Sequence, residues 1–499
     1  MAGKASDAVR EEGLDPELRR LAVVVLLGAV MTILDTTIVN VAVKTFGLAF
    51  HASLTTIQWV LTGYTLALSM SIPITGWAVA RFGAKRMWML SLSLFVAGSV
   101  LCGLAWNVTS LIVFRVLQGG SAGMIMPIGQ TMLAQKAGPH RMGRVMAVIA
   151  VPAMLAPVLG PVFGGFLLEH LSWRWLFLIN VPLCAIALVA AFRYLEPDVR
   201  SGTAPRLDVL GLALLSPGLA FLVYGMAEAG NGESLTGPKV LGGVLVGVLL
   251  VAAFAVHALR REEGALVDVR LFRDRTFRVV NMAFFPYVAA LFGMLVLFPL
   301  YYQVVHGYSA LHSALMTAPM GIGAMITMAV SGRLTDRVGS RALALTGLPV
   351  MLVGVLGFTQ IDYDTPTPLL LGALFVLGVG HGTMMPALMG GMYRTLDRAQ
   401  VPSATAAGNI GMRVGSSLGV AAMAVLLQLA ISDRFPGSSG SLSEIPGGVA
   451  GPAAELLTSA FTHTFWWAFG LAALAFIPIL LIPRGVGSPA AVPAGEPAH

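Results

Sequence analysis

Two charged side chains lie inside long apolar runs of this sequence, and their types fit a proton-binding pair. Asp35 is part of the stretch MTILDTTIVNVAV (31–43), and Arg115 lies in a second apolar run (109–132). A lone charge at the centre of a membrane costs about 2.5–3.5 kcal/mol, so ionisable residues at that depth usually face the protein interior and pair. Burial raises the proton affinity of a carboxylate, whereas a neighbouring guanidinium lowers it. We therefore expect Asp35 to bind a proton whenever its contact with Arg115 weakens.

Helix geometry predicts that the two charges lie at one depth. Asp35 is seven residues from the expected outer end of its helix, roughly 10 Å at 1.5 Å per residue. Arg115 is six residues from the outer end of an oppositely directed helix, or roughly 9 Å. The alternative is a static ion pair that holds the two helices together, which is an expensive choice in lipid. One proton driven by 100 mV supplies about 2.3 kcal/mol, so a single site is sufficient for a roughly fiftyfold substrate gradient.

The composition places these residues in membrane-spanning helices. Of 499 residues, 57% are hydrophobic and 11% are charged, whereas soluble domains carry about 25% charged residues. Apolar runs of about 20 residues, enough to cross a hydrocarbon core of ~30 Å, recur along the chain. They predict an all-α polytopic membrane protein with fourteen spans. The expected spans are 21–42, 55–79, 87–105, 109–132, 143–167, 173–193, 208–228, 239–259, 279–302, 310–332, 342–359, 367–390, 404–430 and 460–483.

The lysines and arginines predict which helix ends face the cytoplasm, because cytoplasmic loops are usually enriched in them. If the N-terminus is cytoplasmic, 25 of the 31 lysines and arginines fall on that side, four fall outside and two lie within helices. This split predicts an even number of spans and cytoplasmic termini. The first apolar run is too long for a signal peptide and is expected to remain as the first helix.

An internal repeat predicts two related bundles. The loop GWAVARFGAKRM (76–87) matches GRLTDRVGSRAL (332–343) at an offset of 256 residues, and LQGGSAGMIMP (117–127) matches LGVGHGTMMP (377–386) at 259. Parallel repeats of this kind are typical of transporters that bind substrate near the membrane midplane. The predicted parts are an N-terminal tail (1–20), an N-terminal six-helix bundle (21–193), two inserted helices with an amphipathic basic linker (194–278), a C-terminal six-helix bundle (279–483) and a C-terminal tail (484–499).

The net charge and the cysteines add no further partner. The net charge of +7 follows from the cytoplasmic basic loops, so it indicates no nucleic-acid partner. Cys102 and Cys184 fall in predicted helices, so they are expected to be buried, reduced thiols, and no metal-ligand spacing surrounds them. The basic linker contains LVDVRLFRDRTFRVV (266–280), which fits an amphipathic segment on the inner membrane surface or, equally, a plain basic linker.

Several motifs together carry a family resemblance. They are LDTTIVNVA (34–42), RVLQGGSAG (115–123), GPVFGG (160–165), WRWLFLINVP (173–182) and LFRDRTFR (271–278). With these motifs the chain resembles the major facilitator superfamily, in its fourteen-helix drug:proton antiporter branch (EmrB/QacA-like). The resemblance implies a facilitator fold of two six-helix bundles plus two inserted helices. It also implies proton coupling through Asp35 and Arg115.

The resemblance implies two further kinds of site. The antiporter motif comprises Gly160, Pro161, Gly164 and Gly165, which would allow a bend and close helix contact, although simple packing explains these residues as well. The gating loops comprise Gly76, Arg81, Gly83, Lys85, Gly332, Asp336, Arg337, Gly339 and Arg341. The first loop has Ala80 where the family usually has an aspartate. We therefore expect the inner gate to depend on the second loop, with Asp336 as its acid.

Other polar residues in the spans are expected to line the substrate cavity: Asn40, Gln58, Tyr64, Gln118, His381, Asn409 and Arg413. His381 and Arg413 share a predicted depth, and His381 would titrate near neutral pH. Arg413 bonded to backbone carbonyls and His381 as a packed polar residue are equally good interpretations.

The sequence thus predicts a proton-coupled exporter of a hydrophobic, drug-like compound, working by alternating access in a bacterial cytoplasmic membrane. It would need no cofactor besides the proton gradient, and it would act as a monomer in the lipid bilayer. A single embedded acid disfavours dicationic drugs and fits monocationic or neutral amphiphiles better. The alternatives are an exporter of an endogenous lipid or metabolite and, from another class, a non-transporting membrane sensor or scaffold. An enzyme is not expected, because no nucleophile–base or metal cluster is found.

Overall fold

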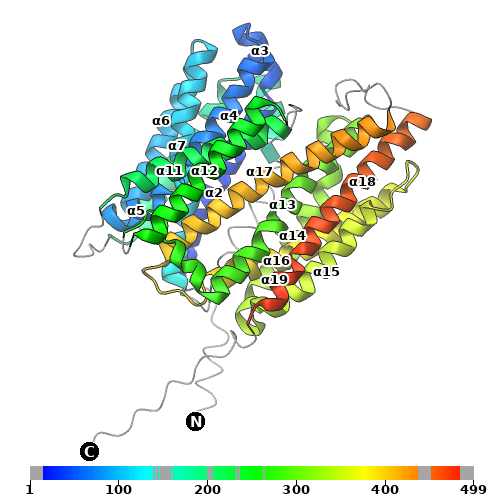
Figure 1. Cartoon of the computed structure of the whole chain (residues 1–499). Helices are drawn as coiled ribbons and strands as arrows, with labels where there is room; N and C mark the ends of the chain where they lie inside the picture. Colours follow the sequence, from blue (N-terminus) through cyan, green and yellow to red (C-terminus); the bar gives the residue numbers. More distant parts are fainter. Residues whose placement is uncertain are drawn as a thin grey trace, which may run out of the picture.

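A computed structural model describes residues 15–138, 141, 145, 159–160, 162–198, 206–230, 233, 236–261, 264–435 and 451–483. Every regular element in this part of the chain is a helix (Figure 1), which confirms the all-α prediction. Twelve of these helices are long and apolar enough to cross a membrane, and a bent pair makes a thirteenth span. Most of the predicted fifth span, 143–167, lies outside the described residues.

The helices of the first half surround α7. They are α2 (Pro16–Asn40), α3 (Val43–Phe50), α4 (Leu54–Ser71), α5 (Ile74–Phe82), α6 (Ala84–Gly103), α7 (Val108–Ala137), α9 (Trp175–Leu178) and α10 (Asn180–Tyr194). Helix α7 packs against α2, α4 and α6. Its start is fixed by a capping box, in which the Asn107 side chain accepts from the Ser110 amide at 2.7 Å.

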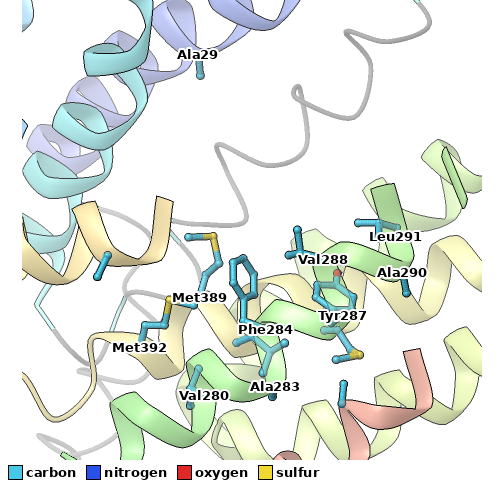
Figure 2. Packing of buried hydrophobic residues seen from close by; sticks show 14 of the residues in the cluster. Ala29, Val280, Ala283, Phe284, Tyr287, Val288, Ala290, Leu291, Met389 and Met392 are labelled. Atoms are coloured by element: carbon cyan, nitrogen blue, oxygen red, sulfur yellow. The ribbon is translucent and has the colours of Figure 1, made fainter. Parts of the chain in front are cut away.

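The second half repeats this arrangement around α16. Its helices are α13 (Arg275–Val304), α14 (Ala310–Val338), α15 (Ser340–Phe358), α16 (Thr367–Met392), α17 (Val401–Arg434), α18 (Pro452–Leu474) and α19 (Phe476–Leu481). Helix α16 packs against α13, α14 and α15. Figure 2 shows Phe284, Tyr287 and Leu291 projecting from α13, with Met389 and Met392 of α16 close by in the same buried cluster. The flexible methionines fill the irregular space beside the aromatic rings.

The internal repeat is visible in backbone geometry. Gly83 separates α5 from α6 with φ 94° and ψ 153°, and Gly339 separates α14 from α15 with φ 89° and ψ 156°. Side chains with a Cβ rarely adopt a positive φ, so both sharp turns require glycine. Since the two residues are 256 positions apart, the offset seen in the sequence corresponds to one turn built twice.

Two local features differ from the sequence prediction. The expected single helix over 55–79 is wrong, because the chain bends by 55° between α4 and α5. Pro73 lies at this break and has no N–H to continue the helical hydrogen bonds. In addition, the short helix α3 follows the first span, where no helix was predicted. His51, the residue just after its end, has a left-handed backbone conformation.

The two halves meet through α17. We call the end of the molecule where α2 begins and α19 ends the lower end, and the opposite end, where α3 lies, the upper end (Figure 1). Helix α17 contacts α5 and α7 of the first half. Its second residue, Pro402, lies at the lower end against Gly76, where a Cβ would come within 3.4 Å of the Pro402 carbonyl oxygen. The lower end is therefore a contact between the halves in this conformation.

The inserted helices α11 (Val209–Gly230) and α12 (Pro238–Arg260) form a closely packed pair beside the two halves. Glycines allow the close approach, because a Cβ on Gly225 would lie 2.8 Å from the Val244 amide nitrogen. Helix α11 contacts both α4 and α17. The inserted pair therefore contacts both halves.

A buried carboxylate at the lower end joins the inserted pair to the linker that follows it. Asp208 is 1% exposed and accepts hydrogen bonds from the Gly211 amide (3.0 Å), His257 Nε2 (2.9 Å), Arg261 Nη1 (3.1 Å) and the Leu266 amide (3.2 Å). Burial by itself raises the pKa of Asp208, but the hydrogen bonds from Gly211, His257 and Leu266 outweigh burial and lower it. The group is therefore charged at neutral pH and holds the segment in place.

Three apolar residues of this linker face the protein, whereas Phe272 is exposed. Leu266, Val267 and Leu271 are buried, and the last of them belongs to the short helix η1 (Val269–Arg273). The backbone amide of Asp268 donates to Ser403 Oγ of α17 at 2.7 Å. The linker is thus tied to the same stretch of α17 that contacts Gly76 at the lower end.

Replacing Asp208 by Asn is expected to lower the melting temperature of the purified protein in detergent. The change removes a buried charge that four donors hold, and breaking such a pair costs about 3–5 kcal/mol. Because the folded-state pKa is lowered, the stabilisation exists at neutral pH and disappears as the pH falls through that pKa. The exposed Asp364→Asn variant is the control. Equal melting temperatures for the two variants at neutral pH would contradict this assignment.

Candidate functional site

Asp35 and Arg115 form a buried ion pair, as the sequence analysis expects from their depth. The Arg115 Nη1 atom donates to Asp35 Oδ2 at 2.7 Å. Asp35 lies one turn before the upper end of α2, and Arg115 lies two turns into α7, which runs in the opposite direction. Asp35 is 0% exposed and Arg115 is 1% exposed, so neither charge reaches solvent in this conformation.

Two side-chain amides complete the shell around the carboxylate. Gln118 Nε2 donates to Asp35 Oδ1 at 3.0 Å, and Asn180 Nδ2 donates to the same oxygen at 2.7 Å. Both amides also donate to Ser99 Oγ, at 2.7 and 3.3 Å. Three donors from α7 and α10 therefore stabilise the charged form of Asp35, which is the form that lacks the proton.

Arg115 is held independently of Asp35. Its Nη1 atom also donates to Gln118 Oε1 at 2.7 Å, and its Nε donates to the Val60 carbonyl at 3.4 Å. The guanidinium carbon lies 3.9 Å from the centre of the Tyr64 ring, a cation–π contact with α4. Because these contacts do not involve Asp35, the guanidinium can keep its place when the carboxylate takes up a proton.

Gln118 and Tyr64, which the sequence predicts in the substrate cavity, are both buried against the ion pair in this conformation. Asn180 and Ser99 are members of this shell that the sequence alone does not predict. Asn180 lies in the quoted motif WRWLFLINVP, and an amide in such an apolar stretch was the available signal. Cys102 and Cys184 are buried and unpaired, as predicted, and Cys102 lies next to this network, with Sγ 3.6 Å from Gln118 Oε1.

The glycines of the predicted antiporter motif differ in their packing. A Cβ on Gly160 would lie 2.1 Å from Thr37 Oγ1, and one on Gly164 would lie 3.1 Å from the Ile38 carbonyl oxygen. Both glycines thus allow close contact with α2, two to three residues after Asp35. Gly165 has nothing within 4 Å of its Cβ position, and Pro161 lies outside the described residues.

Gly160→Ala is expected to impair transport far more than Gly165→Ala. The first change forces Thr37 and the part of α2 that carries Asp35 to shift, and overpacking of this kind costs about 1–3 kcal/mol. The second change adds a methyl group in open space. Initial efflux rates at matched expression are the measurement, and equal loss in both variants would argue against close contact of Gly160 with α2.

An acidic residue from another segment of the chain contacts the first gating loop. Asp198, four residues beyond the end of α10, accepts from the backbone amides of Lys85 (2.9 Å) and Arg86 (3.0 Å) at the start of α6. Lys85 Nζ in turn donates to the carbonyls of Phe192 and Leu195, at 3.2 and 2.6 Å. A carboxylate is thus present at this loop although Ala80 itself has no charge.

The other gating residues are placed as follows. Arg81 is exposed, and Gly332 is buried in α14. In the second loop, Arg341 Nη1 donates to the Ile482 carbonyl at 2.8 Å, which ties the start of α15 to the end of α19. The side chains of Asp336 and Arg337 lie outside what the structure describes, so the expected role of Asp336 stays a prediction.

The remaining predicted cavity residues fall into three groups. Asn40 and Gln58 are exposed near the upper end, apart from the ion pair. His381 is 1% exposed, and the Tyr287 hydroxyl lies 2.5 Å from its Nδ1 atom, between α13 and α16. This burial agrees with the interpretation of His381 as a packed polar residue.

Asn409 and Arg413 connect the two halves of the protein. Asn409 Nδ2 donates to Gln130 Oε1 of α7 at 2.7 Å, and Arg413 Nε donates to Ser69 Oγ of α4 at 3.2 Å. The two residues are one turn apart on α17 and so lie on one face of that helix. Their partners, Gln130 and Ser69, are not predicted from the sequence.

A repeated bundle of membrane-spanning helices with an embedded ion pair is the architecture of many membrane transporters. Comparison with known proteins agrees. The chain belongs to the Major Facilitator Superfamily, whose family model matches residues 25–420.

Relatives and solved structures agree with this family. A "Multidrug resistance protein B homolog" of Mycobacterium tuberculosis is 39% identical over 419 residues, which cover 83% of this chain and 77% of the relative. A "Putative multidrug resistance protein MdtD" of Serratia proteamaculans is 31% identical over 414 residues, or 81% of this chain and 84% of that one. The proton:xylose symporter XylE has the same fold, with a TM-score of 0.60, 13% identity, and coverage of 94% of this chain and 97% of that one.

Proposed function

We propose that this protein exports hydrophobic drug-like molecules in exchange for protons. The names of its bacterial relatives support multidrug export as the activity. The observation that carries the proton-coupled mechanism is the fully buried Asp35, held by Arg115 and by the amides of Gln118 and Asn180. A charged group is rarely buried in a membrane without a function, and a carboxylate is one that can become neutral.

In the proposed cycle, Asp35 binds a proton when the site opens towards the side with the higher proton concentration. Protonation removes the negative charge that attracts Arg115, so the attachment of α2 to α7 weakens. Gly160 and Gly164 lie against Thr37 and Ile38 of α2, two to three residues after Asp35, so a shift of α2 changes its contact with the segment that carries them. Release of the proton on the other side restores the ion pair and completes the exchange.

The distribution of basic residues supports cytoplasmic termini in a bacterial inner membrane. With that orientation, the lower end is cytoplasmic, and the contact between Gly76 and Pro402 closes the cytoplasmic side. The proposed transporter acts as a monomer, and the proton gradient is its only energy source.

The test is substrate-triggered proton release from energised inside-out vesicles, using a panel of cationic, neutral and acidic antibiotics. An antiporter carries the compound into the vesicle and lets protons out, so the interior pH rises on addition of a substrate. Vesicles from cells that lack the protein are the control. If folded protein gives no response to any compound, drug:proton antiport is excluded, and an endogenous lipid or metabolite becomes the first alternative.

A further inference from the structure

Arg413 is a positive charge near the middle of the membrane that has no acidic partner in the described part of the chain. It lies twelve residues after the start of α17, roughly 18 Å along a helix that must cross a core of ~30 Å. Its one hydrogen bond among the described residues is to the neutral Ser69 hydroxyl. Asp35 is the one acid well inside a predicted span, so the sequence offers Arg413 no other membrane-embedded counter-charge.

Asp35 does not neutralise Arg413. Its carboxylate is 0% exposed and is occupied by Arg115, Gln118 and Asn180. The two embedded arginines therefore differ in kind: the charge of Arg115 is compensated and buried, whereas that of Arg413 is uncompensated and partly exposed. An uncompensated charge at this depth is costly, and a bound anion would remove much of that cost.

The position of Arg413 fits a ligand site between the halves. Asn409, one turn earlier on α17, already bonds to Gln130 of α7, so this face of α17 looks towards the first half. Only Nε of Arg413 is engaged, which leaves both Nη groups without a partner among the described residues. A guanidinium with free Nη groups binds carboxylate, sulfonate or phosphate oxygens with strong, charge-assisted hydrogen bonds.

We propose that Arg413 binds the anionic group of the transported molecule, so that the preferred substrates are acidic amphiphiles. This inference rests on the proposed export function and specifies its substrate class. It replaces the expectation of monocationic or neutral compounds, which considered the embedded acid alone. The apolar part of the ligand would lie among the hydrophobic side chains that predominate in the spans.

Matched fluorescent ligands test the inference through binding alone. Dansylglycine, its methyl ester and dansylcadaverine share one apolar scaffold and carry negative, zero and positive charge. Hydrogen bonds to charged groups correspond to about a ten- to hundredfold effect on affinity. We therefore expect the purified full-length protein to bind dansylglycine about ten to a hundred times more tightly than the ester, and dansylcadaverine most weakly.

Three variants assign this preference to the guanidinium. In Arg413→Gln the ratio of the acid and ester dissociation constants should fall close to one, because Gln can still bond to Ser69 but has no charge. Arg413→Lys should keep part of the ratio, and Ser69→Ala should keep it, since both retain the cation. A wild type that binds the acid no more tightly than the ester, or an Arg413→Gln variant with an unchanged ratio, overturns the proposal. If Arg413→Gln does not fold, the ratio of the acid and ester dissociation constants in the wild type and in Arg413→Lys still tests the proposal.

Transport of the same ligands separates this proposal from the function on which it rests. Tight, Arg413-dependent binding of dansylglycine without proton-coupled transport would support the anion site and exclude the antiport mechanism. Proton-coupled transport of the ester and of dansylcadaverine, with no preference for the acid, would support antiport and overturn the anion site.

Discussion

Asp35→Asn is expected to abolish substrate-triggered proton movement. Asparagine has nearly the shape of aspartate and can still accept a hydrogen bond from Arg115, but it cannot bind and release a proton. Because Asp35 is the one acid well inside the predicted spans, the loss should be complete rather than partial. The measurement is proton release from energised inside-out vesicles, together with efflux of the same compound from intact cells at matched expression.

The matched control for this experiment is Asp364→Asn, since Asp364 is an exposed acid at the upper end. It should leave coupling unchanged. Proton movement that persists in Asp35→Asn would mean that another group carries the proton, and His381, buried beside Tyr287, would be tested next.

Arg115→Gln is expected to lower stability strongly, and a second change should recover part of the loss. Removing one partner of a buried ion pair costs about 3–5 kcal/mol, because the other charge stays buried without compensation. The double variant Asp35→Asn with Arg115→Gln has no buried charge at this site, so its loss should be smaller than the sum of the single losses. Melting temperatures of the wild type, both single variants and the double variant in detergent form the cycle that measures this coupling.

The two single variants should also differ from each other. In Arg115→Gln the remaining carboxylate can take up a proton and become neutral, whereas the guanidinium left in Asp35→Asn stays charged at any pH that the protein tolerates. We therefore expect Asp35→Asn to be the less stable of the two. Strictly additive losses, or equal losses that do not change with pH, would indicate that the ion pair is not the main interaction at this site.

The sequence predicted the parts of the fold that depend on hydrophobicity and charge. Long apolar runs predicted the spans, and helix geometry placed Asp35 and Arg115 at one depth, where the structure finds them 2.7 Å apart. The bend at Pro73 was missed because a run of apolar residues is the same whether the helix is straight or bent. The offset of 256 residues between the two loops was predicted correctly, because both copies of the turn need a glycine with positive φ.

The neutral members of the site could not be predicted in the same way. A charge inside a membrane requires a partner, and the sequence contains few residues that could be that partner. An amide such as Asn180, or a hydroxyl such as Ser99, has many neutral partners available, so its type alone does not indicate which residue it contacts. Asp198 and the loop that it caps are more than one hundred residues apart, and only the folded chain shows that they meet.

Helix α10 and the segment after it connect the ion-pair site with the loop at the lower end of the first half. Its first residue, Asn180, holds the Asp35 carboxylate, and the segment just past its end, with Leu195 and Asp198, holds the start of α6 at the lower end. The fifteen residues of this helix span roughly 22 Å as a rigid rod. In the proposed cycle, a displacement of Asn180 on protonation would therefore be carried to the loop at the lower end by one helix, without a series of side-chain rearrangements between the two places. The stiffness of α10 would then set how closely the movement of this loop follows the arrival of the proton.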